Sequence, residues 1–331
     1  MSVQKLHHLR LARKLIAMTE KRINVIFFGN NEPVLDHLVK HPDVNVKSIF
    51  CRPADISNEN IARVKKIADR HSIPLKQPEK KELYSYENYI RDLTPDIIVV
   101  CGYKYIIPVE IFNIPGLGSI NIHPSYLPNY RGQHVINWAI VNGENETGVT
   151  IHFVDKGIDT GDVITQKKIP ILFEDTAKTL HDRIYYEVCE LLQQVINIIV
   201  SGNALPAKKQ DDSKASYFRP RTPEDGAIDW DKNGIEIYNL IRALVKPWPG
   251  AYSYIKDKKM IFRDVRFEAD LRDSAVESNS QNLSAGEIVN ISGSKLVINV
   301  KGGKLLVNDY TIFDENENKT NLDIEVGDKF E

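Results

Sequence analysis

The chain has 331 residues, of which 42% are hydrophobic and 27% are charged, a composition typical of a globular protein with room for about two domains. Its formal net charge of −2 excludes a strong overall attraction to nucleic acid or to an anionic membrane surface. Cys51, Cys101 and Cys189 are scattered without CxxC spacing, which predicts reduced cytosolic thiols and neither disulfides nor a zinc site. No apolar run approaches the length of a membrane span.

The N-terminal half of the chain predicts alternating strands and helices. Residues 1–22 are basic and are expected to form an amphipathic helical extension ahead of the first domain. The apolar run INVIFFG that follows ends at a glycine, as is typical of a buried parallel strand. Later segments predict helices at residues 32–41 and 59–72, and strands at residues 45–50, 96–103 and 119–123. This alternation predicts an α/β fold with a doubly wound parallel sheet.

The rest of the chain predicts the end of this domain and a second, smaller one. Residues 142–171 have the pattern of a β-meander, and a long helix follows from about Asp175 to Val200. The first domain is therefore placed at residues 23–204, and a polar, proline-rich linker at residues 205–225. Short alternating segments in residues 226–331 predict a small antiparallel β-barrel of OB-like type.

The turn after the first strand does not fit the common nucleotide-binding loops. It reads GNNEPV, so Asn30 and Asn31 stand where a GxGxxG motif needs a further glycine for close approach to a pyrophosphate. The chain also lacks a GxxxxGK[ST] phosphate loop, an HExxH metal motif and a GxSxG nucleophile elbow. NAD is therefore disfavoured, and no metal is expected.

The stretch SINIHPSYLPNYRG, residues 119–132, carries the candidate site. Side chains two residues apart on a strand point the same way, so Asn121 and His123 should share one face. They lie at the carboxyl end of a strand, which is where open α/β sheets bind ligands. The amide offers N–H donors for an oxyanion, and the imidazole can transfer a proton near neutral pH.

Three carboxylates follow in the glycine-rich turn FVDKGIDTGD, namely Asp155, Asp159 and Asp162. A carboxylate brought beside His123 would hold its tautomer and favour the imidazolium. Amide, imidazole and carboxylate together suit attack on a carbonyl by a nucleophile that the substrate supplies. Each residue also has a structural explanation, because Asn121 could bond backbone in a turn and the aspartates could form Asx turns.

NIHPSYLPNYRG, followed by GVTIHFVDKGIDTGDVI, resembles the folate-dependent formyltransferase family. The family signature is Asn-x-His, then a Ser-x-Leu-Pro-x-x-Arg-Gly loop, then an aspartate in a VDxGxDxG turn. The resemblance continues through SYFRPRTPEDGAIDW and NLIRALVKPWPGAYSYI. It implies that residues 23–204 form a catalytic domain, which transfers a formyl group from 10-formyltetrahydrofolate to an amine.

The resemblance also implies roles for three residues. Asn121 would stabilise the oxyanion of the tetrahedral intermediate. His123 would take the proton from the attacking amine and pass it to the departing folate nitrogen. Asp159 would orient His123 and raise its pKa.

The folate contacts implied by the resemblance are made largely by backbone. They fall on three segments, namely Tyr105, Ile106 and Ile107, then Ser125, Tyr126, Leu127 and Pro128, and finally Asp155, Lys156, Gly157 and Ile158. The apolar pair that follows Tyr105 is suited to flanking a flat pterin ring, although plain core packing would explain it as well.

The acceptor is less clearly indicated, because two branches of the family are similar to this chain. Methionyl-tRNA formyltransferases need a basic surface for phosphates, but CRPADISNENIARVKK has no glycine and mixed charge. VKPWPGAYSYI and RTPEDGAIDW resemble the branch that formylates nucleotide-linked 4-amino sugars for bacterial surface polysaccharides such as lipopolysaccharide. We therefore expect a cytoplasmic sugar N-formyltransferase. INWAI resembles the tRNA branch, so a methionyl-tRNA formyltransferase is the alternative, and a non-catalytic folate-binding regulator is the second.

A nucleotide-linked acceptor calls for cations and an aromatic side chain. Arg131, Arg242 and Lys246 are candidates for binding the diphosphate, and Trp248 for flanking a base or sugar, although Trp248 could instead anchor domain packing. The expected partners are small molecules, with neither nucleic acid nor membrane among them, and a homodimer is left open.

Overall fold

The computed structural model describes residues 22–53, 59–270 and 283–331. The chain divides into two units, the first built from residues up to 123 with 149–167 and 185–214, and the second from 124–148, 168–184 and 215–331. This division differs from the predicted boundaries, because two segments of the predicted first domain group with the C-terminal residues. The predicted helical extension at residues 1–22 lies outside the described residues except for Arg22.

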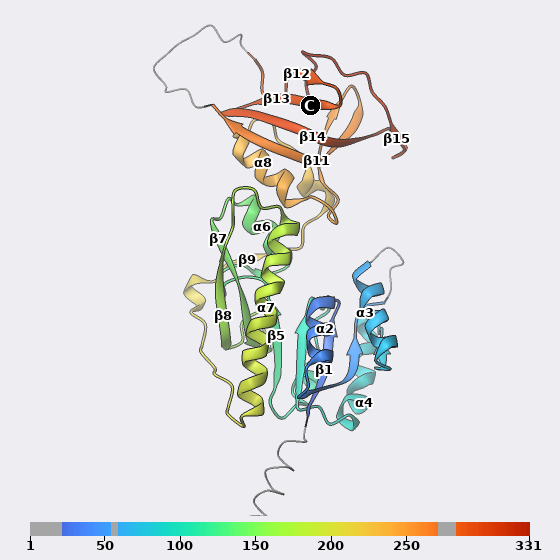
Figure 1. Ribbon diagram of the computed structural model, residues 1–331, viewed down its shortest axis with the longest axis vertical. Coiled ribbons are helices and arrows are strands. Elements are labelled where there is room, and N and C mark those ends of the chain that lie inside the picture. Colours follow the sequence, from blue (N-terminus) through green and yellow to red (C-terminus); the bar gives the residue numbers. More distant parts are fainter. Residues whose placement is uncertain (1–21, 54–58, 271–282) are drawn as a thin grey trace, which may run out of the picture. The chain divides into compact units, whose positions relative to one another are not determined.

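The first part of the chain forms a seven-stranded sheet. Its elements are β1 (Ile23–Gly29), α2 (Glu32–Lys40), β2 (Val44–Phe50), α3 (Glu59–Arg70), β3 (Leu75–Lys76), η1 (Lys80–Tyr86), α4 (Glu87–Asp92), β4 (Ile97–Cys101), α5 (Val109–Phe112), β5 (Ser119–His123), β6 (Arg131–Gly132), α6 (Val135–Val141), β7 (Glu146–Phe153), β8 (Val163–Pro170) and α7 (Ala177–Val200). The strand order is β3-β2-β1-β4-β5-β7-β8 (Figure 1). The neighbouring strands β3, β2, β1, β4 and β5 run parallel to one another, which confirms the predicted parallel sheet. β7 pairs with β5 in the antiparallel direction.

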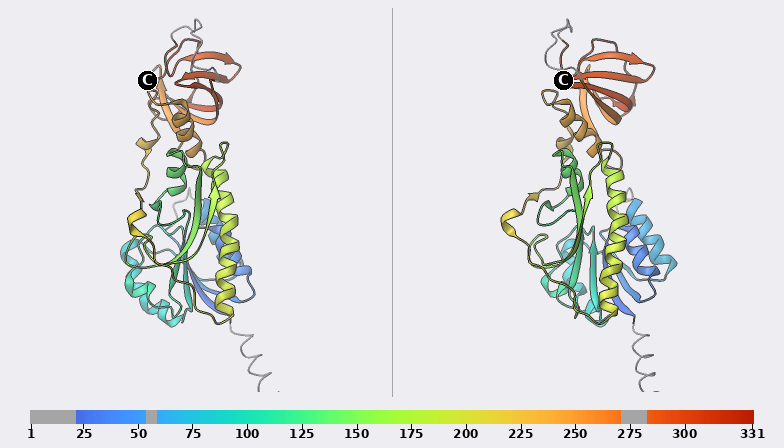
Figure 2. Two further views of the ribbon diagram at one scale, coloured as in Figure 1. Left: turned by 90° about the vertical axis from the view of Figure 1, so that its left-hand side faces the viewer. Right: turned by 60° about the vertical axis from the view of Figure 1, so that its left-hand side comes forward.

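From Val25 to Phe28 the first strand is apolar and buried, because both faces of the sheet are covered. Ile26 and Phe28 pack into a buried cluster with side chains of β4, η1, α4 and α5, whereas Val25 and Phe27 are buried on the opposite face. Figure 2 shows the helices on both sides, with α2 and α3 on one face and α4 on the other. The sheet is therefore a rigid support, and its strand ends can position functional groups.

The remaining elements belong mainly to the second unit. They are η2 (Asp212–Lys214), β9 (Tyr217–Phe218), η3 (Pro223–Gly226), α8 (Gly234–Ala243), β10 (Ala251–Ile255), β11 (Lys258–Ala269), β12 (Ile288–Ser292), β13 (Lys295–Val300), β14 (Gly303–Phe313) and β15 (Lys319–Thr320). The strand order is β10-β11-β14-β13-β12 with β15 beside β14, and all these pairs are antiparallel.

This antiparallel sheet confirms the prediction made from the alternating C-terminal segments. In the described part of the chain, its hydrogen-bonded ladders run from β10 to β12 through β11, β14 and β13. Its inner face is apolar, and α8 buries Ile237 and Ile241 in the same core as Trp230 and Phe262.

No helix in residues 22–53, 59–270 and 283–331 combines the length and the apolar character needed to cross a membrane.

Candidate active site

The candidate site is built on the antiparallel pair β5 and β7. Asn121 is half-buried and His123 is 4% exposed, while Ile120 and Ile122 are buried on the other face of β5. The register places His152 of β7 directly opposite Asn121. Paired residues of an antiparallel ladder share a face, so the register brings a second imidazole to the site.

Sequence reasoning missed His152. Its position depends on the register between β5 and β7, which no local pattern gives. The available signal was an imidazole between Ile151 and Phe153 in the mainly apolar strand segment VTIHFV. The rings of His123 and His152 are 6.5 Å apart between centroids and nearly perpendicular.

The turn between β7 and β8 brings a carboxylate to these rings. Asp159 Oδ2 lies 3.5 Å from His123 Nδ1, and Asp159 Oδ1 lies 3.6 Å from His152 Nε2. Asp155 serves the turn itself, since its Oδ1 accepts hydrogen bonds from the Gly157 backbone and from Thr160 Oγ1. Of the three predicted carboxylates, Asp159 is therefore the one that faces the imidazoles.

The hydrogen bonds fix the orientation of the Asn121 amide. Asn121 Nδ2 donates to Asp159 Oδ1 over 3.2 Å, and a flipped amide would point its oxygen at the carboxylate. His152 Nδ1 lies 2.7 Å from the Phe153 carbonyl, which can only accept, so this nitrogen carries the proton. In a neutral ring Nε2 then accepts, and it lies 3.2 Å from Asn121 Nδ2.

This network has a consequence for any reaction at the site. Both N–H groups of Asn121 are directed at protein acceptors, one on Asp159 and one on His152. An incoming carbonyl oxygen would have to replace one of these acceptors in order to use the amide as a donor. His152 holds the amide through one neutral hydrogen bond, which costs less to exchange than a bond to a carboxylate.

The cysteines do not offer a nucleophile. Burial raises the pKa of Cys51 to about 11 and that of Cys101 to about 12, and it also raises the pKa of Cys189. All three therefore remain protonated thiols at neutral pH, and the thiolate is the reactive form. Within the part of the chain that the structure describes, no group of three or more histidines, cysteines and acids could hold a metal ion.

The predicted folate contacts in the first unit include two exposed apolar side chains. Ile106 is 71% exposed and Ile158 is 53% exposed, which is unusual for isoleucine and is suited to an apolar ligand. Ile107 is buried in the core, and Tyr105 donates from its hydroxyl to Glu79. Lys156 and Gly157 lie exposed in the turn, next to Ile158.

The predicted loop contacts belong to the second unit and have mixed environments. Ser125 is buried and donates from Oγ to the Asn129 carbonyl, and Leu127 is buried ahead of a cis peptide bond to Pro128. Tyr126 is half-buried, with the Lys168 ammonium 5.3 Å from its ring centroid. The loop is thus held by its own side chains, which leaves its backbone to meet a ligand.

The predicted acceptor residues separate into buried and exposed groups. Arg131 is 1% exposed and donates from Nη1 to the Tyr217 hydroxyl. Arg242 is also buried, and it donates to Asn239 Oδ1 and to backbone carbonyls of the 172–175 segment. These bonds indicate that both guanidinium groups stabilise the packing of the second unit, so we do not propose either arginine as a ligand of the acceptor.

The other two acceptor candidates lie close together in the sequence. Lys246 is exposed, and Trp248 packs partly buried against the core of its own unit. The alternative predicted for Trp248 was an anchor of domain packing. The contacts that the structure gives for it lie within its own unit.

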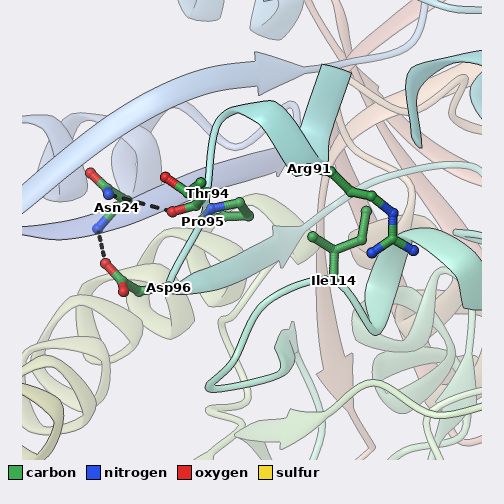
Figure 3. A pocket seen from close by; sticks show the side chains of 6 residues that line it. All are labelled: Asn24, Arg91, Thr94, Pro95, Asp96 and Ile114. Atoms are coloured by element: carbon green, nitrogen blue, oxygen red, sulfur yellow. Dashed lines mark hydrogen bonds between the residues drawn. The ribbon is translucent and has the colours of Figure 1, made fainter. Parts of the chain in front are cut away.

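A cavity of the first unit has a volume of about 470 Å³ and is lined by Asn24, Arg91, Thr94, Pro95, Asp96 and Ile114 (Figure 3). Asn24 and Asp96 mark the amino ends of β1 and β4, opposite to the strand ends that carry the candidate site. The Asn24 backbone N–H donates to the Asp96 carboxylate, and the Asn24 side chain donates to the Thr94 carbonyl. These bonds join the amino ends of the two strands, whereas ligands of such sheets bind at the carboxyl ends.

Comparison with known families gives two matches along the chain. The family model described as "Formyl transferase" matches residues 21–196, and that described as "Formyl transferase, C-terminal domain" matches residues 221–320. A methionyl-tRNA formyltransferase of Citrifermentans bemidjiense is 39% identical over 248 residues, which are 73% of this chain and 77% of the relative.

A second relative has a different name. The bifunctional polymyxin resistance protein ArnA of Wigglesworthia glossinidia brevipalpis is 41% identical over 218 residues, which cover 65% of this chain and 33% of that protein. Among solved structures, an N-formyltransferase from Helicobacter canadensis superposes with a TM-score of 0.64 at 22% identity, covering 86% of this chain and 98% of that chain. At this identity the likeness concerns the fold.

Proposed function

From the premise that the chain belongs to the formyl transferase family and is a formyltransferase, we propose that it formylates the amine of a nucleotide-linked amino sugar. The formyl donor is 10-formyltetrahydrofolate, and the product serves surface polysaccharide synthesis. The single observation that carries the chemistry is the meeting of Asn121, His123 and Asp159 at the end of β5.

The three side chains act on different atoms of the reaction. Bound 10-formyltetrahydrofolate supplies the formyl carbon. His123 takes the proton from the attacking amine while the new C–N bond forms, and then delivers it to the departing folate nitrogen. Asn121 donates an N–H to the formyl oxygen as it becomes negative, a contribution typically worth about 3 kcal/mol. Asp159 favours the charged form of His123 during the transfer.

Two features support folate as the donor. The exposed Ile106 and Ile158 offer apolar surface to a flat ring, and both belong to the unit that contains the three site residues. HypX from Aquifex aeolicus, whose fold resembles this chain with a TM-score of 0.62 at 16% identity over 91% of this chain and 46% of that chain, has been solved with tetrahydrofolic acid. The Helicobacter canadensis enzyme has been solved with folinic acid and dTDP-3-aminofucose.

The charge of the C-terminal region favours a sugar acceptor over tRNA. Residues 221–331 contain 15 lysines and arginines against 20 aspartates and glutamates, a net charge of −5. Phosphate contacts dominate nucleic-acid affinity, so an acidic region is poorly suited to hold tRNA. The second candidate remains methionyl-tRNA, because methionyl-tRNA formyltransferases are among the similar proteins over most of their length.

The acceptor is identified by a direct formylation assay. The purified chain is incubated with 10-formyltetrahydrofolate and, separately, with UDP-4-amino-4-deoxyarabinose, a dTDP-linked amino sugar or methionyl-tRNA. Mass spectrometry is expected to show a gain of one formyl group on a sugar nucleotide and none on tRNA, with His123→Ala as the inactive control. Formylation of methionyl-tRNA alone would overturn the choice of acceptor and leave the formyl-transfer chemistry in place.

A further inference from the structure

Gln210 contacts the turn that carries the site carboxylate. Its Nε2 donates to the Asp159 carbonyl over 2.8 Å and to the Gly161 carbonyl over 2.7 Å. One amide group thus donates to two carbonyls, which belong to the residues before and after Thr160. Gln210 lies in the predicted linker, outside the predicted catalytic domain, and sequence reasoning gave it no role.

The backbone around Gln210 fixes where its side chain begins. Lys208 forms an antiparallel bridge with Val163 at the start of β8, with hydrogen bonds of 2.8 and 2.9 Å in both directions. Gln210 follows two residues later and is half-buried. The segment is therefore attached to the edge of the sheet next to the turn. This backbone pairing places Gln210 beside the turn.

The turn needs external support because its geometry is strained. Asp159 has φ = 55°, in the left-handed region that costs a non-glycine residue roughly 1 kcal/mol. Such conformations persist only where the surroundings determine them. Gly161 packs so closely that a Cβ there would lie 1.8 Å from the Phe153 carbonyl oxygen, which fixes one side of the turn. The Gln210 amide holds the carbonyls of the turn itself.

The placement of the carboxylate is sensitive to small movements of this turn. Asp159 is 3.5 Å from His123 Nδ1 and 3.2 Å from Asn121 Nδ2, so a shift of about 1 Å would break both contacts. A displacement of that size can lower the rate about 10²-fold. Among the described residues, Asp159 on the turn and His152 on β7 are titratable groups that lie against His123.

We propose that Gln210 is a positioning residue, which holds the carboxylate of Asp159 against His123 by bonding the carbonyls of Asp159 and Gly161. The inference rests on the proposed function only in taking His123 as the proton-transfer group. It extends the site from the sheet into the segment that leads to the C-terminal residues.

The test uses Gln210→Glu, which keeps the shape but replaces both N–H donors with oxygens that repel the carbonyls. We expect kcat for formyl transfer to fall about 10²-fold, with a smaller change in KM for the amine. Gln210→Met, which removes the donors without adding charge, should behave in the same direction. Gln193→Met is the matched control, because Gln193 bonds His41 and Asn197 away from the site.

A positioning role predicts coupling and a change in titration that general destabilisation would not produce. Gln210→Glu should add little to Asp159→Asn in the double variant, because both remove the same contact. The His123 ring, followed by NMR in labelled full-length protein, should titrate at lower pH in Gln210→Met, as it should in Asp159→Asn.

The outcomes separate this inference from the proposed function. If wild-type chain formylates no acceptor, the proposed function fails, and the NMR titration still tests Gln210. Full activity of both Gln210 variants would overturn the positioning role. Lower activity with an unmoved His123 titration, or with fully additive effects in the double variant, would overturn it as well.

Discussion

Asn121, His123 and Asp159 in the first unit are polar groups largely withdrawn from water, and so are Arg131 and Arg242 in the second. The two sets of residues form hydrogen bonds with different kinds of partner. The guanidinium groups donate to a tyrosine hydroxyl, an amide oxygen and backbone carbonyls. The first set faces other exchangeable side chains at 3.2 to 3.6 Å, which is long for charged hydrogen bonds.

The partners of a buried polar residue distinguish a group that can take part in chemistry from one that only packs. Backbone carbonyls cannot change protonation state, so an arginine bonded to them is held in one role. Two imidazoles, an amide and a carboxylate at loose distances can exchange protons and accept a substrate atom between them. Substitutions in the first set should therefore lower turnover, whereas substitutions of the buried arginines should lower stability.

The largest effect is expected at His123. His123→Ala removes the proton-transfer group, and turnover should fall about 10²- to 10⁴-fold in the formylation assay. Thermal unfolding by circular dichroism should show that the chain still folds. His71→Ala is the control, because that histidine is exposed at the end of α3. Unchanged turnover in His123→Ala would remove this residue from the mechanism.

Arg242 should show the opposite behaviour, with a loss of stability and little change in activity. Arg242→Met leaves the carbonyls of Leu172 and Asp175 without their charged donor, at a cost of about 3 kcal/mol in the free energy of unfolding. Urea unfolding followed by tryptophan fluorescence would report it, since Trp230 lies in the core of this unit.

The control for Arg242 is Lys246→Met, which changes an exposed cation on the same stretch of chain. Its free energy of unfolding should stay within about 0.5 kcal/mol of wild type. A raised KM for the sugar nucleotide in Arg242→Met, with normal stability, would contradict the packing role and restore this arginine as a phosphate ligand.

An intermediate effect is expected at the exposed apolar surface of the first unit. Ile106→Asp places a charge where an apolar ring is proposed to lie, and KM for 10-formyltetrahydrofolate should rise about tenfold or more. The melting temperature should not change, because the side chain makes few contacts in the folded chain. Leu117→Asp, another exposed position of the same unit, is the control and should leave KM unchanged.

The smallest effect concerns an exposed ion pair of the second unit. The hydrogen bond from Arg219 lowers the pKa of Asp225 to about 2, below the value of about 3.9 in an unfolded chain. A depressed pKa stabilises the folded state above pH 4, and this contribution disappears as the pH falls from about 4 to 2.

Asp225→Asn should therefore lower stability by less than about 1 kcal/mol at pH 7, because Arg219 is exposed to solvent. The difference from wild type should vanish near pH 2 in urea unfolding measured across this range. Asp231→Asn, at a 96% exposed side chain, gives the baseline for removing an acid. A difference that grows toward low pH would contradict the assignment.

The parts of the molecule that were predictable have local patterns. Continuous apolar runs gave β1 and β4, and the alternating segments after residue 250 gave the antiparallel strands. Asn121 and His123 were placed on one face by strand periodicity alone. The carboxylate that reaches them could not be chosen from three aspartates by spacing, and the family resemblance singled out Asp159.

The parts that were missed depend on contacts between distant residues. His152 joins the site through the register of two strands, and Gln210 reaches Asp159 across 51 residues. Arg242 bonds the Asp175 carbonyl 67 residues away, so its sequence context suggested a free cation. The two-residue strands β6 and β9 are too short to carry any periodicity.

The pairing of Asn121 with His152 limits how this protein can be altered. An insertion of one residue within β7 would turn Ile151 or Phe153 toward the amide and send the imidazole to the opposite side of the sheet. Directed evolution that permits length changes should therefore accept them in the exposed stretch around Gly143 and reject them between Val149 and Phe153.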